Sequence, residues 1–179
     1  MNRTIPMEYT VVNENFAQGK EGSISVVNIN GHVSILKQFK LTKSPDRLHR
    51  EASLQRAAHE LGIAPEVYHV DCRAKQIFMQ GIDHLLLEVA KARQPSRLLP
   101  SETQRIEQML TCLDQNGIFH NDGNCRNVMV DHAGVLFIID YGMSKKINDR
   151  FRKKTTSPNI RYGLEALKRS FKQNGIAWP

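Results

Sequence analysis

Three oxygen-bearing side chains follow one another at a spacing that could support catalysis. Asp122 is followed five positions later by Asn127, and Asp140 comes thirteen residues after that, in the tripeptide Asp140-Tyr141-Gly142. A carboxylate can accept or orient the proton of an incoming hydroxyl, and carboxylate and amide oxygens are the ligands that magnesium prefers. The spacing therefore favours phosphoryl transfer, with Asp122 as the base and Asn127 and Asp140 as metal ligands.

The residues between these side chains predict a β-hairpin. Two apolar runs, 128–130 and 135–139, flank the turn sequence Asp131-His132-Ala133-Gly134. A hairpin of this length would hold both metal ligands at one rim. We interpret His120 as a structural histidine that braces the loop, because Asp122 already fills the role of the base.

Upstream of this segment, residues 11–39 alternate short apolar runs with glycines and predict β-structure. Gly19, Gly22 and Ser23 fit a degraded phosphate-covering loop, in which Ala17 stands where a first glycine is usual. Glycine lets the backbone approach phosphates closely and offer its N–H groups to them. A glycine-containing hairpin turn is the commoner reading of such a segment when it is taken alone.

After the two-residue turn Asn30-Gly31, a strand is predicted at 32–39, and it carries a lysine on an apolar face. Lys37 alternates with Val33, Ile35 and Phe39, and a buried ammonium group requires a carboxylate partner. The helix predicted from Ser44-Pro45 to Gly62 offers Glu51 as that partner, with Glu60 as the alternative. Lys40 is the alternative lysine.

Two further strands, at 66–70 and 75–79, complete a predicted five-stranded antiparallel sheet. We therefore expect an N-terminal lobe at 1–79, a hinge at 80–82 and a reduced, mainly helical C-terminal lobe at 83–179. The backbone of Met79 and Gly81 would hydrogen-bond an adenine edge. A core strand that runs into a turn fits the same residues equally well.

Three helices are expected in the second lobe, which gives the chain an α+β class. The first is short, at 84–92. The second begins at the capping-box sequence Ser101-Glu102-Thr103-Gln104 and stops at Asn116-Gly117. The third begins at Ser157-Pro158, is apolar on one face and ends before Gly175.

Taken together, the motifs from Ala17 to Gly142 resemble those of the protein kinase-like superfamily. The resemblance implies a minimal two-lobed fold, ATP as phosphate donor, and Mg²⁺ as the metal with Mn²⁺ as an alternative. Two differences from the usual kinase motifs limit what this resemblance implies. Asn121 replaces the arginine that binds an activation-loop phosphate, so control by loop phosphorylation is not expected. Only residues 143–179 follow the motif, without Ala-Pro-Glu, so we expect no large peptide-binding subdomain.

The length, the short tail and His120-Asn121-Asp122 are similar to the minimal effector kinases that bacteria secrete. More narrowly, they resemble the plant-pathogen type III effector family that phosphorylates the eukaryotic ninety-kilodalton heat-shock chaperone. That resemblance implies a Ser/Thr protein kinase and virulence factor that acts in the host cytoplasm and inactivates the chaperone.

The composition limits the remaining function classes. The formal net charge is +7, and six of the cations lie between Lys145 and Lys154, which predicts either a solvated basic loop or a site for an acidic partner. Three cysteines without CxxC pairing favour a reducing compartment. We find no signal-peptide pattern or spanning stretch, and we expect a soluble monomer without nucleic-acid or membrane partners.

Two other functions fit part of the pattern. A small-molecule kinase acting on a sugar or an antibiotic shares the His-x-Asp and downstream Asp, but normally adds a helical subdomain around its substrate. A pseudokinase keeps the fold and works by docking a partner. The presence of Lys37, Asp122, Asn127 and Asp140 together argues against that second alternative.

Overall fold

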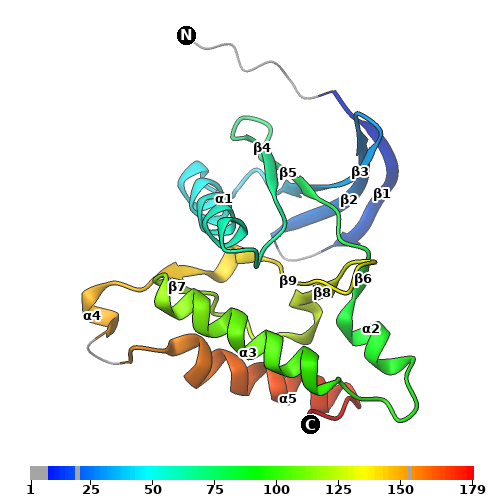
Figure 1. Ribbon diagram of the computed structural model, residues 1–179. Coiled ribbons are helices and arrows are strands. Elements are labelled where there is room, and N and C mark those ends of the chain that lie inside the picture. Colours follow the sequence, from blue (N-terminus) through cyan, green and yellow to red (C-terminus); the bar gives the residue numbers. More distant parts are fainter. Residues whose placement is uncertain (1–7, 19–20, 153–154) are drawn as a thin grey trace. The chain divides into compact units, whose positions relative to one another are not determined.

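The computed structural model describes residues 8–18, 21–152 and 155–179, which form two compact units (Figure 1). The sheet unit comprises the described residues up to Ala52 together with Glu66–Gly81. The helical unit comprises Ser53–Pro65 and the described part of Ile82–Pro179. The chain therefore passes between the units within one helix, after Pro65, and again after Gly81. The α+β class predicted from the sequence is confirmed.

The sheet unit contains the predicted five antiparallel strands, in the spatial order β1-β2-β3-β5-β4. Asn30 and Gly31 form the β2–β3 turn with φ values of 51° and 86°, and the Asn28 side chain accepts the Gly31 N–H at 2.8 Å. Positive φ at both turn positions is what a two-residue hairpin requires, so this turn prediction is confirmed. The strands are β1 (Thr10–Gln18), β2 (Gly22–Ile29), β3 (His32–Phe39), β4 (Val67–Asp71) and β5 (Gln76–Gln80).

The two faces of this sheet pack into different apolar clusters. One face buries Leu36 of β3 with Val27, Ile29 and Phe78. The other buries Phe39, with Ile35 packed beside it, against Leu48 and Ala52 of helix α1 (Pro45–Glu60). Lys37 alternates with Ile35 and Phe39, so its side chain leaves the strand on the face that α1 covers. Val33, predicted to share that apolar face, is 64% exposed.

Helix α1 begins as its sequence predicts. The hydroxyl of Ser44 accepts the Arg47 N–H at 3.4 Å, and the Ser44 carbonyl accepts the Leu48 N–H at 3.2 Å. A proline at the first helical position lacks only an N–H that the helix would leave unpaired. The helix ends before Gly62, whose φ is 69°.

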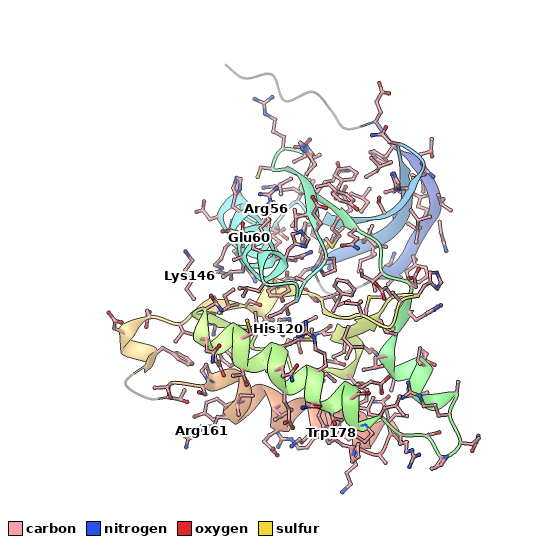
Figure 2. All side chains as sticks on the ribbon, in the orientation of Figure 1. Arg56, Glu60, His120, Lys146, Arg161 and Trp178 are labelled. Carbon is pink, nitrogen blue, oxygen red and sulfur yellow. The ribbon has the colours of Figure 1, made fainter. Side chains whose placement is uncertain are left out.

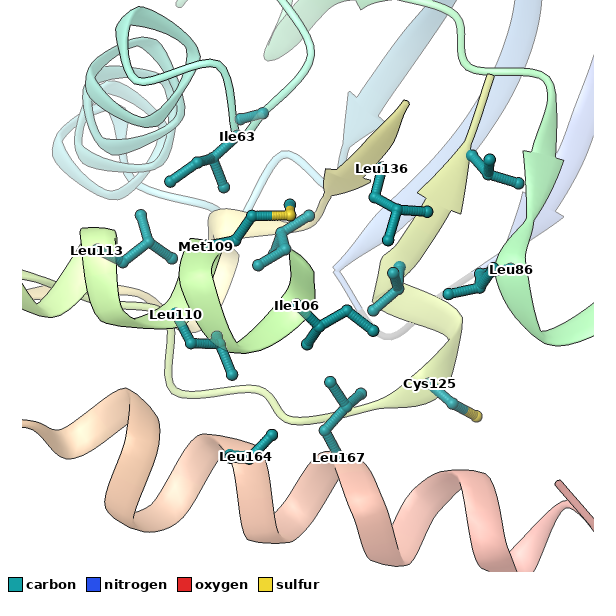
Figure 3. Packing of buried hydrophobic residues seen from close by; sticks show 14 of the residues in the cluster. Ile63, Leu86, Ile106, Met109, Leu110, Leu113, Cys125, Leu136, Leu164 and Leu167 are labelled. Carbon is teal, nitrogen blue, oxygen red and sulfur yellow. The ribbon is translucent and has the colours of Figure 1, made fainter. Parts of the chain in front are cut away.

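In the helical unit, one large apolar cluster joins helix α3 to the short strands and to the C-terminal helix (Figure 3). Its centre is formed by Ile106, Met109, Leu110 and Leu113, one face of α3, together with Leu164 and Leu167. The helices are α2 (Leu86–Lys91), α3 (Pro100–Gln115), α4 (Asp149–Arg152), the π-helix η3 (Asn159–Leu164) and α5 (Glu165–Gln173). The strands are β6 (His84–Leu85), β7 (Ile118–Phe119), β8 (Val128–Val130), β9 (Leu136–Ile138) and β10 (Lys145–Lys146).

Three details of the predicted helices are wrong. The short helix predicted at 84–92 begins at Leu86, because His84 and Leu85 form strand β6 and pair with β8. Helix α3 begins at Pro100 rather than at Ser101, and Glu102 bonds back to the Leu99 N–H at 2.7 Å. The last helix is not one α-helix, because its first six residues are a π-helix whose N-cap, Pro158, makes no side-chain cap bond. Trp178 is half-buried and packs on Phe171 at 5.8 Å between ring centroids.

No helix within the described residues combines the length and the apolar character that crossing a membrane would require.

Candidate active site

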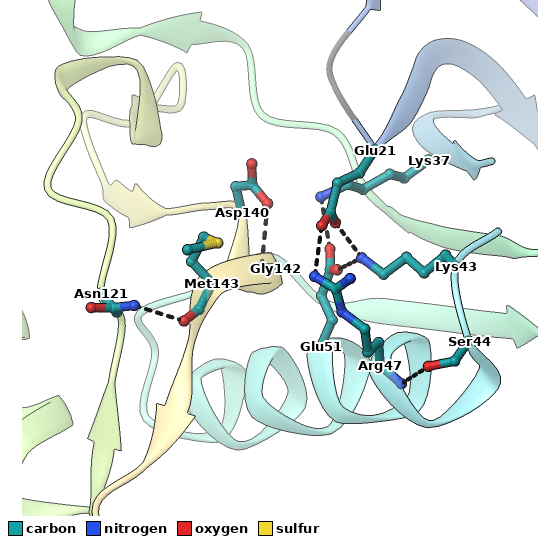
Figure 4. Close-up of polar contacts among 10 residues, drawn as sticks. All are labelled: Glu21, Lys37, Lys43, Ser44, Arg47, Glu51, Asn121, Asp140, Gly142 and Met143. Carbon is teal, nitrogen blue, oxygen red and sulfur yellow. Dashed lines mark hydrogen bonds and ion pairs between the residues drawn. The ribbon is translucent and has the colours of Figure 1, made fainter.

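In the sheet unit, the lysine on β3 and the glutamate on α1 form an ion pair. Lys37 Nζ lies 2.7 Å from Glu51 Oε1, and the two side chains are 15% and 2% exposed (Figure 4). The carboxylate partner of Lys37 is thus Glu51, whereas the alternative lysine, Lys40, is exposed. Lys37 lies on a strand and Glu51 lies near the middle of a helix. The distance between the two side chains is therefore set by the packing of α1 on the sheet.

Sequence reasoning missed a second lysine in the same cluster. Lys43 Nζ lies 2.6 Å from Glu51 Oε2 and 2.6 Å from Glu21 Oε2, and its ammonium group sits 4.0 Å from the centroid of the Phe39 ring. The Lys43 side chain is only 4% exposed. One signal was available: Lys43 directly precedes the N-terminus of α1, where a cation is unfavourable unless carboxylates hold it.

Glu21 completes this cluster at the start of β2. Its other oxygen, Oε1, lies 2.9 Å from Arg47 on the first turn of α1. The hydrogen bond from Lys43 is the largest effect on this carboxyl, and together with the charges of Lys43, Arg47 and Lys37 it lowers the pKa of Glu21 below 4.5, although partial burial acts in the opposite direction.

The predicted phosphate-covering residues are only partly described. Gly19 lies outside the described residues. Gly22 pairs with Phe39 in the β2–β3 ladder, and a Cβ atom there would collide with the Gln38 carbonyl. Packing of β2 against β3 is therefore enough to explain a glycine at position 22. Ser23 is the next residue of β2. The roles of Gly22 and Ser23 toward phosphate remain predictions.

The predicted adenine-binding residues lie at the end of β5. Met79 is 9% exposed and is paired with Ile35 on one side and Val67 on the other. Gly81 follows the last residue of the strand, and a Cβ atom there would lie 3.0 Å from the Val33 carbonyl. Binding of adenine by Met79 and Gly81 remains a prediction.

In the helical unit, the loop before β8 is built around His120, which is buried inside the unit (Figure 2). Its Nε2 lies 3.0 Å from the Ile139 carbonyl, its own carbonyl accepts the Ser144 hydroxyl at 3.0 Å, and its ring meets the Tyr141 ring edge-on at 4.9 Å. Burial lowers the pKa of His120 below 6.5, against smaller opposing effects of the Ile139 carbonyl and of Asp122 and Asp140. These contacts suit a bracing role and a neutral ring.

A buried asparagine holds the same loop from the other side. Asn159 accepts the His120 N–H at 2.9 Å and donates to the Ile118 carbonyl at 2.6 Å and to Asp114 Oδ1 at 2.7 Å. Burial raises the pKa of Asp114, although the N–H groups of Asn159 and Ile160 counteract it. No spacing rule links position 159 to position 120, so no local pattern predicted that Asn159 holds this loop.

The segments that carry the three predicted catalytic and metal-binding residues of this unit are connected through two hydrogen bonds, one from a side chain to the backbone and one within the backbone. Asn127 Nδ2 donates to the Asp122 carbonyl at 3.4 Å, and the Asn127 carbonyl accepts the N–H of Ile139 at 2.9 Å, directly before Asp140. Pairing of β8 with β9 in the register Val128↔Ile138 continues this contact. The structure thus brings Asp122, Asn127 and Asp140 to one end of a hairpin.

Two residues of the segment have left-handed backbone conformations. Asn121 has a φ of 64° and donates from its side chain to the Met143 carbonyl at 3.2 Å, while Asp140 has a φ of 63° and accepts the Gly142 N–H at 3.3 Å (Figure 4). Asparagine and aspartate tolerate this conformation better than other side chains that carry a Cβ atom. The backbone conformation of the loop therefore favours the residue types at both positions, apart from any chemistry that they perform.

The donor atoms available here fit a magnesium ion held partly by a phosphate ligand. The Asn127 amide nitrogen bonds to the Asp122 carbonyl, so the amide oxygen is the atom that would serve as a ligand, and the second ligand would be the carboxylate of the exposed residue Asp140. Magnesium is usually bound by one or two carboxylates together with substrate phosphates and water. Within the described residues, no three His, Cys, Asp or Glu side chains gather as a self-sufficient metal cluster.

The basic run after the motif is partly described. Lys145 and Lys146 are exposed in β10, which pairs with β7 just before His120. Figure 2 labels Lys146. Lys153 and Lys154 lie outside the described residues. The two described lysines are accessible to a partner on the strand that flanks the loop.

The fold and these residues define a member of the protein kinase-like superfamily. The family model of the ABC1 atypical kinase-like domain matches residues 51–161, which is more than half of the chain. The chain belongs to this family. The matched range includes Glu51 and the whole segment from His120 to Gly142. A comparison with curated proteins finds no match.

Proposed function

We propose that this chain is an ATP-dependent Ser/Thr protein kinase that uses Mg²⁺, with Mn²⁺ as an alternative. The observation that carries the proposal is the connection of Asp122, Asn127 and Asp140 at one end of the β8–β9 hairpin. The Lys37–Glu51 ion pair and membership of a kinase-like family support it.

Each residue has a distinct role in this proposal. Asp122 accepts or orients the proton of the acceptor hydroxyl. Asn127 and Asp140 would hold magnesium, which when bound neutralises charge on the phosphate oxygens. Lys37, kept in place by Glu51, contributes positive charge toward the phosphates. Gly22 and Ser23 would face the phosphates, and the backbone at Met79 and Gly81 the adenine.

The proposed substrate is a host protein. The resemblance to secreted bacterial effector kinases supports a virulence role in the host cytoplasm, with the ninety-kilodalton heat-shock chaperone as the target that phosphorylation inactivates. The exposed Lys145 and Lys146, beside the catalytic loop, supply positive charge that would attract an acidic stretch of such a substrate.

Incubation of the protein with a eukaryotic lysate, γ-labelled ATP and magnesium tests this proposal. We expect a discrete labelled protein band, with phosphoserine or phosphothreonine identified by mass spectrometry, and no band with Asp140→Ala. Label found only in low-mass metabolites would favour a small-molecule kinase. Equal labelling by the wild type and Asp140→Ala would refute the catalytic assignment.

A further inference from the structure

The ion cluster of the sheet unit contains one more buried lysine than the proposed chemistry uses. Both oxygens of Glu51 are engaged, Oε1 by Lys37 and Oε2 by Lys43, each within 2.7 Å. The carboxylate is 2% exposed, so water contributes little to its solvation. A single buried negative charge is therefore shared between two ammonium groups.

The two lysines differ in what they can reach. Lys37 is 15% exposed, whereas Lys43 is 4% exposed, has a carboxylate at 2.6 Å on two sides and has the Phe39 ring below it. An ammonium group with three donors that already serves two carboxylates has little capacity left for a ligand. Lys43 is thus placed to hold protein groups rather than to contact a substrate.

We propose that Lys43 is a positioning residue for Lys37. By binding Oε2 of Glu51, it fixes the carboxylate so that Oε1 points at Lys37. Lys43 also neutralises part of the negative charge of Glu51, so that Lys37 does not carry the whole of that ion pair alone. The same ammonium group ties Glu21, and with it the start of β2, to the N-terminal end of α1. This inference rests on the proposed function, in which Lys37 serves the phosphates.

Loss of the Lys43 charge has a specific consequence for Lys37. Glu51 would remain buried with Lys37 as its sole cation among the residues of this cluster, and a buried carboxylate stabilises the charged form of a neighbouring amine. The Lys37 amine would then be protonated for more of the time and drawn toward Glu51. Its rate of acylation by an amine-directed reagent should fall, a readout that does not depend on phosphoryl transfer.

The experiment compares the wild type with Lys43→Met, Lys43→Arg and the control Lys91→Met, which removes an exposed lysine paired with Glu88. Acylation of Lys37 is followed by peptide mass spectrometry, and kcat and the KM for ATP are measured on the labelled lysate protein. In Lys43→Met we expect acylation of Lys37 to slow by about 3- to 10-fold, because a neighbouring charge has changed. We expect kcat to fall by about 10- to 100-fold through misplacement of Lys37.

Lys43→Arg, which keeps the charge, should recover most of both values, and Lys91→Met should match the wild type. Acylation of Lys37 at an unchanged rate in Lys43→Met would overturn the inference, because Lys43 would then have no effect on Lys37. Faster acylation would also overturn it, because it would show that loss of Lys43 opens the cluster and exposes the Lys37 amine. Lys43→Gln gives the same expected direction should the methionine variant not fold. Slower acylation in a protein that labels no substrate would keep the inference and refute the proposed function.

Discussion

The sheet unit and the helical unit hold their candidate residues by different forces. In the sheet unit, Lys37, Lys43 and Glu51 are fixed by contacts between charged side chains from three segments. In the helical unit, the loop that carries Asp122 is fixed mainly by hydrogen bonds to backbone groups, through His120 and Asn159. The first arrangement depends on charge and the second on geometry.

This difference affects how each unit should respond to substitution. Charges that share a counterion can redistribute when one is removed, so effects in the sheet unit should be graded. A buried hydrogen-bonding group that loses its partner retains the full desolvation penalty, so effects in the helical unit should be abrupt. The following variants test that contrast, from the largest expected effect to the smallest.

The largest effect is expected at the proposed base. Asp122→Asn should lower the rate of phosphate transfer by about 10²- to 10⁴-fold, since a positioned base contributes that much. This loss should exceed that of Lys43→Met. The rate is measured with labelled ATP, and Glu107→Gln, which removes a surface carboxylate of the helical unit, serves as control. A loss in Asp122→Asn smaller than in Lys43→Met would reverse the proposed ranking.

The second variant removes the buried bracket of the helical unit. Asn159→Ala leaves the Ile118 carbonyl and the His120 N–H without their side-chain partner, and it removes one of the donors to the Asp114 carboxylate, which keeps the N–H groups of residues 159 and 160. Urea unfolding should show a loss of about 3 kcal/mol in the free energy of unfolding, within the range for buried polar groups of which one is charged. Asn116→Ala, at an exposed helix end, is the matched control. A loss equal to that of the control would show that the bracket is dispensable.

Acidification should affect the helical unit before the sheet unit. The pKa of His120 is below 6.5, so its contribution to stability is complete above that value and is lost as the pH falls through the folded-state pKa. The pKa of Glu21 is below 4.5, so its contribution is retained to lower pH and is then lost in the same direction. Peptide-resolved hydrogen exchange across a pH series measures both.

The controls for this series are His120→Leu and Glu21→Gln. Each should flatten the pH dependence in its own window while leaving the other window unchanged. Identical pH dependence in the wild type and His120→Leu between pH 6.5 and 4.5 would contradict the assignment of the first loss to the buried histidine.

The smallest effect is expected at Tyr141. Its ring is fully buried, its hydroxyl has no hydrogen-bond partner among the described residues, and burial raises the pKa of the phenol far above 10. Tyr141→Phe should leave the free energy of unfolding unchanged or raise it by up to ~1 kcal/mol, because an unpaired buried hydroxyl is unfavourable. Thermal unfolding checks this, and a clear loss of stability would indicate a hidden partner.

Local patterns predicted much of the fold. Asn30-Gly31 and Ser44-Pro45 each act through backbone geometry within a few residues, and both turned out as expected. The N-cap of α3 was misplaced by two residues because Ser101 was read as the cap, whereas Leu99 holds that position and Pro100 is the first helical residue. This error concerns where the helix begins, and the prediction that a helix is present here is correct.

The parts that could not be predicted depend on contacts between distant segments. Strand alternation and helix position identified Lys37 and Glu51, whereas the one local signal at Lys43, a cation just before helix α1, did not show that it shares the Glu51 carboxylate. The π-helix at η3 begins at Asn159, whose N–H and side chain bond to Asp114 in α3. Tertiary hydrogen bonds of this kind accompany a local geometry that propensity does not encode.

The central claim is that Asp140, with Asn127, would bind the metal that accompanies ATP. Calorimetric titration of the wild type and Asp140→Ala with ATP, in magnesium and in a chelator, tests it most directly. We expect magnesium to strengthen ATP binding by the wild type about 10-fold or more, and Asp140→Ala to lose that increase while matching the wild type in chelator. Equal affinities of both proteins in magnesium would contradict the account.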